Sequence, residues 1–220
     1  MIPQAARLLL VALIGSSLGS ADAQEPSPFV PTALTEAVTE GNTAFANKDF
    51  VTARRAYERV LDLDPQNILG LVNLGLVEFQ LGNTDAAEKV LKQAISLRLE
   101  TAPAWLTLGM IQLDRGETDA AFASLAQAVL HDPLNPRSRN FLGVVSGKRG
   151  WIDSAQAELR RAVELDPTYA DAHYNLAVMY LQENPPAVEL ARRHYQKALD
   201  LGVDPDADME KTFSAGRENP

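Results

Sequence analysis

The sequence of 220 residues contains no cysteine. This absence excludes disulfide bonds, thiolate metal sites, thiol nucleophiles and lipid attachment at an N-terminal cysteine. Histidine is also scarce: the chain has only His131, His173 and His194, and no two of them lie three or four residues apart. Helical metal sites and acid–base catalysis need such side chains close together, so we expect no metal ion, no cofactor and no catalytic histidine.

An excess of basic residues is absent as well. The chain has 20 lysines and arginines against 29 aspartates and glutamates, which gives a formal net charge of −9. A surface that binds nucleic acid needs a cluster of cations to neutralise the phosphates. Nucleic acid is therefore not an expected partner.

Basic residues gather between positions 137 and 161, and one interpretation of this cluster is a site for an anion or an acidic peptide. The other interpretation is structural. Lys148 and Arg149 end a predicted helix, where cations interact favourably with the helix dipole, and Arg160 and Arg161 fall mid-helix on a solvent face. We prefer the structural interpretation.

No apolar run is long enough to cross a membrane. The run at residues 8–15 is far shorter than the roughly 20 residues that a spanning helix needs. It follows Arg7 and precedes Ala21-Asp22-Ala23, which is the pattern of a secretory signal peptide. We expect residues 1–23 to be cleaved between Ala23 and Gln24, leaving a periplasmic or secreted chain without a membrane span. The alternative is an uncleaved anchor.

The segment 24–33 is rich in proline and is expected to be an extended spacer without fixed structure.

Beyond this segment the chain carries a pattern that recurs every 34 residues. Leucine before a small residue stands at Leu74-Gly75, Leu108-Gly109, Leu142-Gly143 and Leu176-Ala177. Three further columns keep this spacing: Ala53, Ala87, Ala121 and Ala155; Tyr57, Leu91, Leu125 and Leu159; and Val60, Ala94, Ala128 and Ala162. Such self-similarity indicates one supersecondary unit copied along the chain, each copy burying its apolar face on the next.

Each copy is predicted to hold two short helices, because apolar or small residues lie three and four positions apart within it. Glycines such as Gly116 interrupt the copies and permit a left-handed end to the first helix. Asp132-Pro133 and its counterparts end the second helix, since proline cannot continue it. His173 shares its column with Trp105 and Leu71, so we interpret it as a packing residue.

These features resemble the tetratricopeptide repeat family, whose 34-residue units carry Trp, Leu-Gly, Ala and Pro at fixed places. Residues 102–135 match best, with Trp105, Leu108, Gly109, Ala121, Leu125, Ala128 and Pro133. The resemblance implies an all-α fold, a right-handed solenoid of antiparallel helix hairpins. Five repeats are expected, at 34–67, 68–101, 102–135, 136–169 and 170–203, followed by a short capping helix and tail at 204–220. Glu40 replaces leucine in the first copy, which suits a helix exposed on its outer side.

In such solenoids the first helix of each hairpin lines the concave side, and the resemblance implies a partner-binding groove there. Pro103 and Thr107 stand where repeats of the co-chaperone type place cations, so capture of a terminal carboxylate is not expected. The lining is apolar and edged by amides, which suits an amphipathic helix or an extended apolar peptide. The expected groove residues are Asn42, Phe45, Val72, Asn73, Leu76, Phe79, Leu106, Met110, Leu113, Asn140, Phe141, Val144, Tyr174 and Val178.

The expected function is a non-catalytic scaffold that binds a protein or peptide partner. No enzyme is expected, because no nucleophile–base set and no phosphate loop is present. Two alternatives stay open: a substrate-recognition subunit of an envelope enzyme or of a secretion or pilus assembly, and a solenoid that self-associates. The sequence also leaves open whether the chain's own termini occupy the groove.

Overall fold

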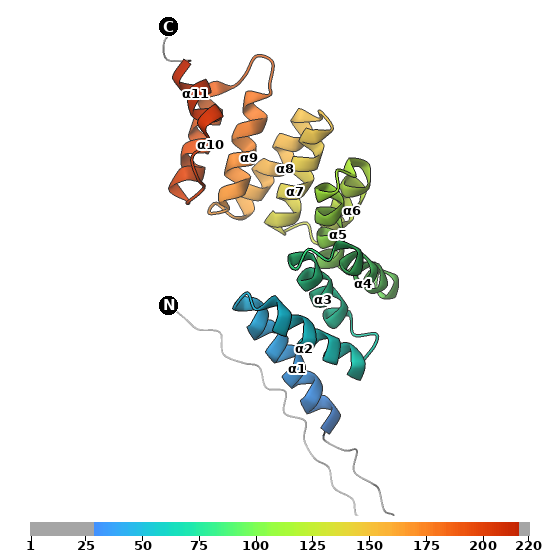
Figure 1. Cartoon of the computed structure of the whole chain (residues 1–220). Helices are drawn as coiled ribbons and strands as arrows, with labels where there is room; N and C mark the ends of the chain where they lie inside the picture. The colour runs from blue at the N-terminus through green and yellow to red at the C-terminus, as the bar shows by residue number, and fades with distance from the viewer. Residues whose placement is uncertain (1–28, 216–220) are drawn as a thin grey trace, which may run out of the picture.

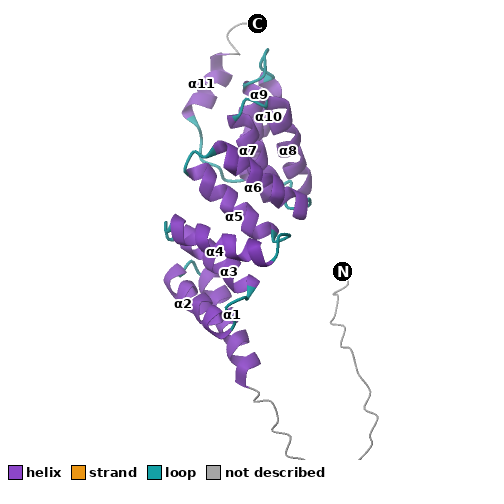
Figure 2. Ribbon diagram, turned by 90° about the vertical axis from the view of Figure 1, so that its right-hand side faces the viewer, coloured by secondary structure: helices purple, strands orange, loops and turns teal. Residues whose placement is uncertain are grey.

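The computed structural model describes residues 29–215, and every regular element in this part of the chain is a helix (Figure 2). The helices form five consecutive hairpins and one final helix. Their bounds are α1 (Phe29–Ala46) and α2 (Phe50–Leu63); α3 (Ile68–Gln80) and α4 (Thr84–Leu97); α5 (Ala102–Asp114) and α6 (Thr118–His131); α7 (Pro136–Lys148) and α8 (Ile152–Leu165); α9 (Ala170–Leu181) and α10 (Val188–Asp200); and α11 (Ala207–Ala215). None of the helices among the described residues has the length and apolar character needed to span a membrane.

The expected signal peptide, with its cleavage site at Ala23 and Gln24, lies outside the described residues, as do residues 24–28 of the expected spacer and the last five residues of the tail. The spacer prediction is wrong at its C-terminal end, because α1 begins at Phe29 rather than at residue 34. Pro31 is compatible with this start. The N–H groups of the first helical turn have no intrahelical acceptor, so the N–H that proline lacks costs no hydrogen bond there.

The hairpins stack into an arc (Figure 1). Helices pack most extensively within a hairpin, and each second helix then packs against the first helix of the next hairpin. Some consecutive first helices also contact each other: α3 with α5, α5 with α7, and α7 with α9. Consecutive second helices among the described residues make fewer contacts with each other than these pairs do. In a curved stack the elements on the inner side are closest together, so the first helices line the concave side.

The small-residue columns form the core of the stack. Ala53, Ala87, Ala121 and Ala155 are fully buried, and so are Leu91, Leu125 and Leu159. Gly109 lies where the two helices of its hairpin come closest, and a Cβ built on it would be 2.6 Å from Cγ of Leu125. The turn inside the hairpin also requires glycine, because Gly116 has φ +74°.

The residues at the repeat position of Trp105 and His173 make hydrogen bonds that the sequence pattern did not predict. Trp105 donates from Nε1 to the carbonyl of Leu99 at 2.7 Å, in the linker before its own helix. Arg139 and His173, at the same repeat position, contact the linker carbonyls of Pro133 and Pro167 in the same way, at 3.1 and 3.2 Å. The interpretation of His173 as a packing residue is therefore incomplete, because its ring also holds the linker.

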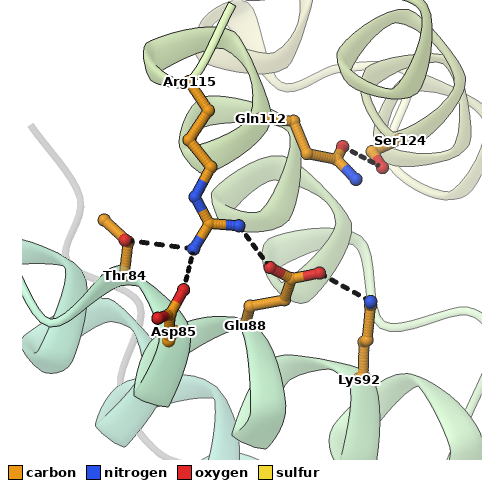
Figure 3. Close-up of polar contacts among 7 residues, drawn as sticks. All are labelled: Thr84, Asp85, Glu88, Lys92, Gln112, Arg115 and Ser124. Carbon is orange, nitrogen blue, oxygen red and sulfur yellow. Dashed lines mark hydrogen bonds and ion pairs between the residues drawn. The ribbon is translucent and has the colours of Figure 1, made fainter. Parts of the chain in front are cut away.

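Figure 3 shows a polar clamp between the second and third repeats. Arg115, at the end of α5, donates to Asp85 and Glu88 of α4 at 2.5 Å each and to Thr84 Oγ1 at 3.1 Å. Lys92 also pairs with Glu88, at 2.6 Å. The hydrogen bonds from Lys92 and Arg115 lower the pKa of the Glu88 carboxyl. Glu88 is mostly shielded, with 22% of its side chain exposed, and it ties the two repeats together.

The same clamp position recurs 34 residues later, where Arg149 pairs with Asp119 at 2.9 Å. Its guanidinium also lies 4.0 Å from the ring centroid of Trp151 and 5.0 Å from that of Phe122. Arg139 pairs with Glu158 at 2.7 Å. These contacts occupy much of the basic cluster of the fourth repeat, which agrees with the structural interpretation of that cluster.

The two ends of the stack are finished differently. At the C-terminal end, α11 covers the last hairpin by burying Met209 and Phe213 in a cluster with Tyr195 and Tyr180. At the N-terminal end, α1 has no such cover among the described residues. The positions that face the preceding repeat in α3, such as Leu74 and Val77, correspond in the first repeat to side chains that are polar and exposed: Glu36, Glu40 and Thr43 in α1 and Asn47 just after it.

Candidate functional site

Most of the expected groove residues lie on the concave side with part of their surface open to solvent. We use the term concave face for these residues of the five first helices. Asn42 is exposed, and the others are half-buried: Phe45, Asn73, Leu76, Phe79, Met110, Leu113, Phe141, Val144, Tyr174 and Val178.

Three expected groove residues are not available to a partner. Val72 and Leu106 are only 8% and 7% exposed, and each belongs to a core cluster, Val72 with Ala104 of the next first helix. Asn140 is 3% exposed, and both polar atoms of its amide form hydrogen bonds within the protein, to Tyr169 and Asn175. This column faces the following repeat, because the first helices pack against one another on the inner side of the curve.

A small pocket opens on the concave face between the first two repeats. Its volume is about 120 Å³, and it is lined by Asn42, Phe45, Tyr57, Asn73 and Leu76. Oδ1 of Asn42 accepts from the Tyr57 hydroxyl at 2.8 Å and from Nδ2 of Asn73 at 3.5 Å. Burial raises the pKa of Tyr57, so its hydroxyl stays protonated and remains a donor. No hydrogen bond within the described residues uses Nδ2 of Asn42 or Oδ1 of Asn73, so one donor and one acceptor stay free there.

A second amide pair lies three repeats further along. Asn175 donates from Nδ2 to Oδ1 of Asn140 at 3.0 Å, and Asn140 donates to the Tyr169 hydroxyl at 3.3 Å. Burial is the main reason that the pKa of Tyr169 is raised. Sequence reasoning missed Tyr57 and Tyr169 as partners of the amides, because both residues lie outside the first-helix columns that define the groove.

A larger pocket of about 530 Å³ lies at the C-terminal end of the concave face, between α9 and the loop that leads to α11. Tyr174 donates to Oδ2 of Asp206 at 2.6 Å, and Oδ1 of Asp206 accepts from the backbone N–H groups of Asp208 and Met209. The bond to Asp206 raises the pKa of Tyr174 to about 12 and lowers that of Asp206. The chain's own C-terminal segment thus covers part of Tyr174, and Asp171 and Asp204 complete an acidic rim.

Within residues 29–215, no three histidine, aspartate or glutamate side chains are grouped closely enough to hold a metal ion. The concave face instead combines apolar side chains with amides and two pockets. Such a surface can bind a peptide or protein segment.

Sequence comparisons agree with the architecture. A family model described as tetratricopeptide repeat matches residues 44–108, and a second, described as TPR repeat, matches residues 147–183. The chain is a tetratricopeptide repeat protein. The match at 44–108 runs from the end of α1 to the middle of α5, and the match at 147–183 runs from the end of α7 through α8 and α9. No curated protein matches the sequence.

Solved structures of other proteins share the fold. A crystal structure of MamA protein is 25% identical, with a TM-score of 0.62, and the match covers 78% of this chain and 92% of that one. The pilF protein of Pseudomonas aeruginosa is 16% identical with a TM-score of 0.72, covering 84% and 89%. YrrB, described as a TPR protein with an unusual peptide-binding site, is 21% identical with a TM-score of 0.62, covering 86% and 100%. At these identities the last two show the fold alone.

The tetratricopeptide repeats also bring together two histidines that lie far apart in sequence. Nε2 of His173 faces the carbonyl of Pro167, which can only accept, so this nitrogen carries the proton. Nδ1 of His173 is then the acceptor for Nδ1–H of His194, at 3.0 Å. Burial lowers the pKa of both rings, to about 4 for His194, where nearby His173 and Arg193 lower it further.

This pair predicts an acid-sensitive stability. The folded protein keeps both rings neutral, whereas the unfolded chain binds protons near pH 6.5, so stability falls as the pH drops from about 6.5 towards 4. Because His194 is partly exposed, we expect a loss of about 1 to 2 kcal/mol. Urea unfolding at about pH 7 and pH 5 measures it, and His194→Gln should reduce the difference between the two midpoints. An unchanged difference in the variant would show that other groups cause the acid sensitivity.

Proposed function

We propose that this tetratricopeptide repeat protein is a non-catalytic scaffold that binds a partner peptide on its concave face. The observation that carries the proposal is the recurrence of half-buried apolar side chains at the same places in successive first helices, such as Leu76, Met110 and Val144. A buried core would have covered these side chains. The repeats instead present them in one row, where an apolar partner could bury them.

The free amide groups favour an extended peptide over a helix as the occupant. The Nδ2 group of Asn42 and the Oδ1 atom of Asn73 offer a donor and an acceptor side by side. An extended peptide has unpaired backbone C=O and N–H groups that could bind both, whereas a helix uses these groups internally. The adjoining pocket of about 120 Å³ has room for one small apolar side chain. YrrB, a TPR protein with an unusual peptide-binding site, accords with this class of ligand.

The test is loss of peptide binding without loss of folding. Twelve-residue peptides selected from a random display library on the wild-type protein serve as probes, with affinity measured by fluorescence anisotropy. Phe79→Ala combined with Met110→Glu should weaken binding at least about tenfold, because apolar contacts at the centre of an interface carry most of its energy. Asn73→Ala should weaken it less and should leave the core untouched.

The matched control is Arg160→Glu with Arg161→Glu on the outer helix α8, where both side chains are exposed. Exposed charges contribute little once salt screens them, so this variant should bind normally. Circular dichroism and urea midpoints verify that the variants fold. Retained binding by the concave-face variant, together with lost binding by the arginine variant, would move the site to the basic surface of the fourth repeat.

The polar end of the stack supports hetero-partner binding over head-to-tail self-association. A further hairpin stacked on α1 would place apolar residues against Glu36, Glu40, Thr43 and Asn47, and Glu40 already forms an ion pair with Arg59. Burying such groups without new partners is costly. We therefore propose a monomeric solenoid, which light scattering can verify.

We also propose that the protein is exported, on the basis of Arg7, the apolar run at residues 8–15 and the sequence Ala21-Asp22-Ala23. N-terminal sequencing of the protein recovered from its native host should begin at Gln24. An intact Met1 in cytoplasmic fractions would contradict export and would leave the peptide-binding proposal unaffected.

A further inference from the structure

The concave face changes in chemical character along its length. Its first three repeats present apolar and amide side chains, and its C-terminal end opens into the pocket of about 530 Å³ beside α9. Tyr174 belongs to both regions, because it is a concave-face residue and also lines this pocket. The pocket therefore continues the surface on which we place the peptide.

Three of the nine residues that line this pocket are aspartates, and none is a lysine, arginine or histidine. Asp206 is engaged by Tyr174 and by the start of α11, so its charge stabilises the fold. Asp171 and Asp204 are exposed, and neither forms an ion pair with a side chain of the described residues. Their charges face the pocket without a cation to balance them.

Two cations of the neighbouring helix α7 form no ion pair with Asp171 or Asp204. Arg137, at the position of Asp171 one repeat earlier, lies 5.9 Å from the ring centroid of Phe141 in a cation–π contact. Lys148 stands at the far end of the same helix α7. The chain as a whole carries a net charge of −9, so no general excess of cations compensates for the pocket.

We infer that the occupant of the concave face is an extended peptide with an apolar centre and a lysine or arginine at one end, seated with that cation between Asp171 and Asp204. This inference rests on the proposed function and assigns the direction and charge of its ligand. The apolar side chains of the concave face supply most of the contact area with the peptide. The aspartates set the position and direction of the peptide, because charge complementarity at the edge of an interface determines orientation more than affinity. A peptide that ends in acidic residues is excluded from this end by like charge.

The experiment repeats the random 12-residue display selection on four forms of the full chain. They are the wild type, Asp171→Asn with Asp204→Asn, the concave-face variant Phe79→Ala with Met110→Glu, and the matched control Asp62→Asn with Asp153→Asn. The control removes two exposed aspartates from the first and fourth repeats and changes the net charge equally. Asp206 is left intact because it begins α11.

The wild type and the control should select peptides with an apolar centre and with lysine or arginine enriched at one end. The pocket variant should keep the apolar centre and lose the basic enrichment, and a lysine-ended peptide should bind it about fivefold more weakly than the wild type. Basic enrichment that persists in the pocket variant, or apolar selection without any basic end in the wild type, overturns the inference and leaves the proposed function standing. Absence of selection on the wild type contradicts both.

Discussion

Gly109→Leu is expected to lower the free energy of unfolding by about 2 to 3 kcal/mol. Even a Cβ at this position would come within 2.6 Å of Cγ and 2.8 Å of Cδ2 of Leu125, and a leucine adds three more carbon atoms. Leu125 is fully buried, so it cannot move aside without opening a gap elsewhere in the core. Urea unfolding followed by circular dichroism measures the loss.

The matched surface control is Lys89→Gln in α4, because Lys89 is exposed and forms no ion pair among the described residues. It should leave the midpoint unchanged. Glu88→Gln, which looks equally neutral in the sequence, should lower the midpoint measurably because it weakens the clamp to Arg115. Equal midpoints for the three variants would contradict this repeat register.

Detaching the final helix should have the other large effect. Met209→Asp with Phe213→Asp places two charges in a cluster where the native side chains are each 6% exposed. We expect a loss of about 3 to 5 kcal/mol in the stability of the last hairpin, because apolar burial is lost and an uncompensated charge cannot stay buried. The uncovered surface around Tyr195 and Tyr180 should then drive self-association at micromolar concentration.

Differential scanning calorimetry and analytical ultracentrifugation measure the two consequences. Asp208→Asn with Lys211→Gln is the matched control, since both side chains are exposed on the same helix. A double-aspartate variant that keeps the wild-type melting temperature and stays monomeric would show that α11 is not a cap.

The fold was predictable because the residues that build it repeat. In the first four hairpins a glycine of the first helix lies against a large side chain of the second helix, as Gly75 does against Leu91 and Gly109 against Leu125. Close packing of helices requires small residues where backbones approach. The turn after α5 was also predictable, because Gly82, Gly116 and Gly150 follow the repeat spacing and all have positive φ. Periodicity alone therefore specified hairpins, turns and stacking order.

The site was only partly predictable. Leu76 and Met110 lie on the concave face as expected, but Val72, Leu106 and Asn140 are buried. A helical pattern shows which residues share a face, yet the boundary between the face that meets the next repeat and the face that meets solvent depends on how tightly the stack curves. That curvature depends on all the contacts between repeats together, so the residue type at one repeat position does not predict it.

Pairings that break the repeat were invisible in the sequence. His173 and His194 are 21 positions apart and lie in different helices, so helical spacing does not predict their contact. The acidic pocket likewise combines α9 with the loop before α11, where the chain departs from its 34-residue period. Local patterns cannot report a contact that forms only when an irregular loop meets a regular helix.

The most direct test of peptide binding on the concave face is a methyl NMR titration of the full chain with a library-selected peptide. The peptide should shift the methyl signals of Leu76, Met110, Leu113 and Val144 on the first helices. The signals of Leu130 and Leu134 should stay in place; these side chains are 67% and 65% exposed but belong to the end of α6 and the linker between the third and fourth repeats. Shifts confined to Leu130 and Leu134, with the concave-face methyls unmoved, would contradict the account.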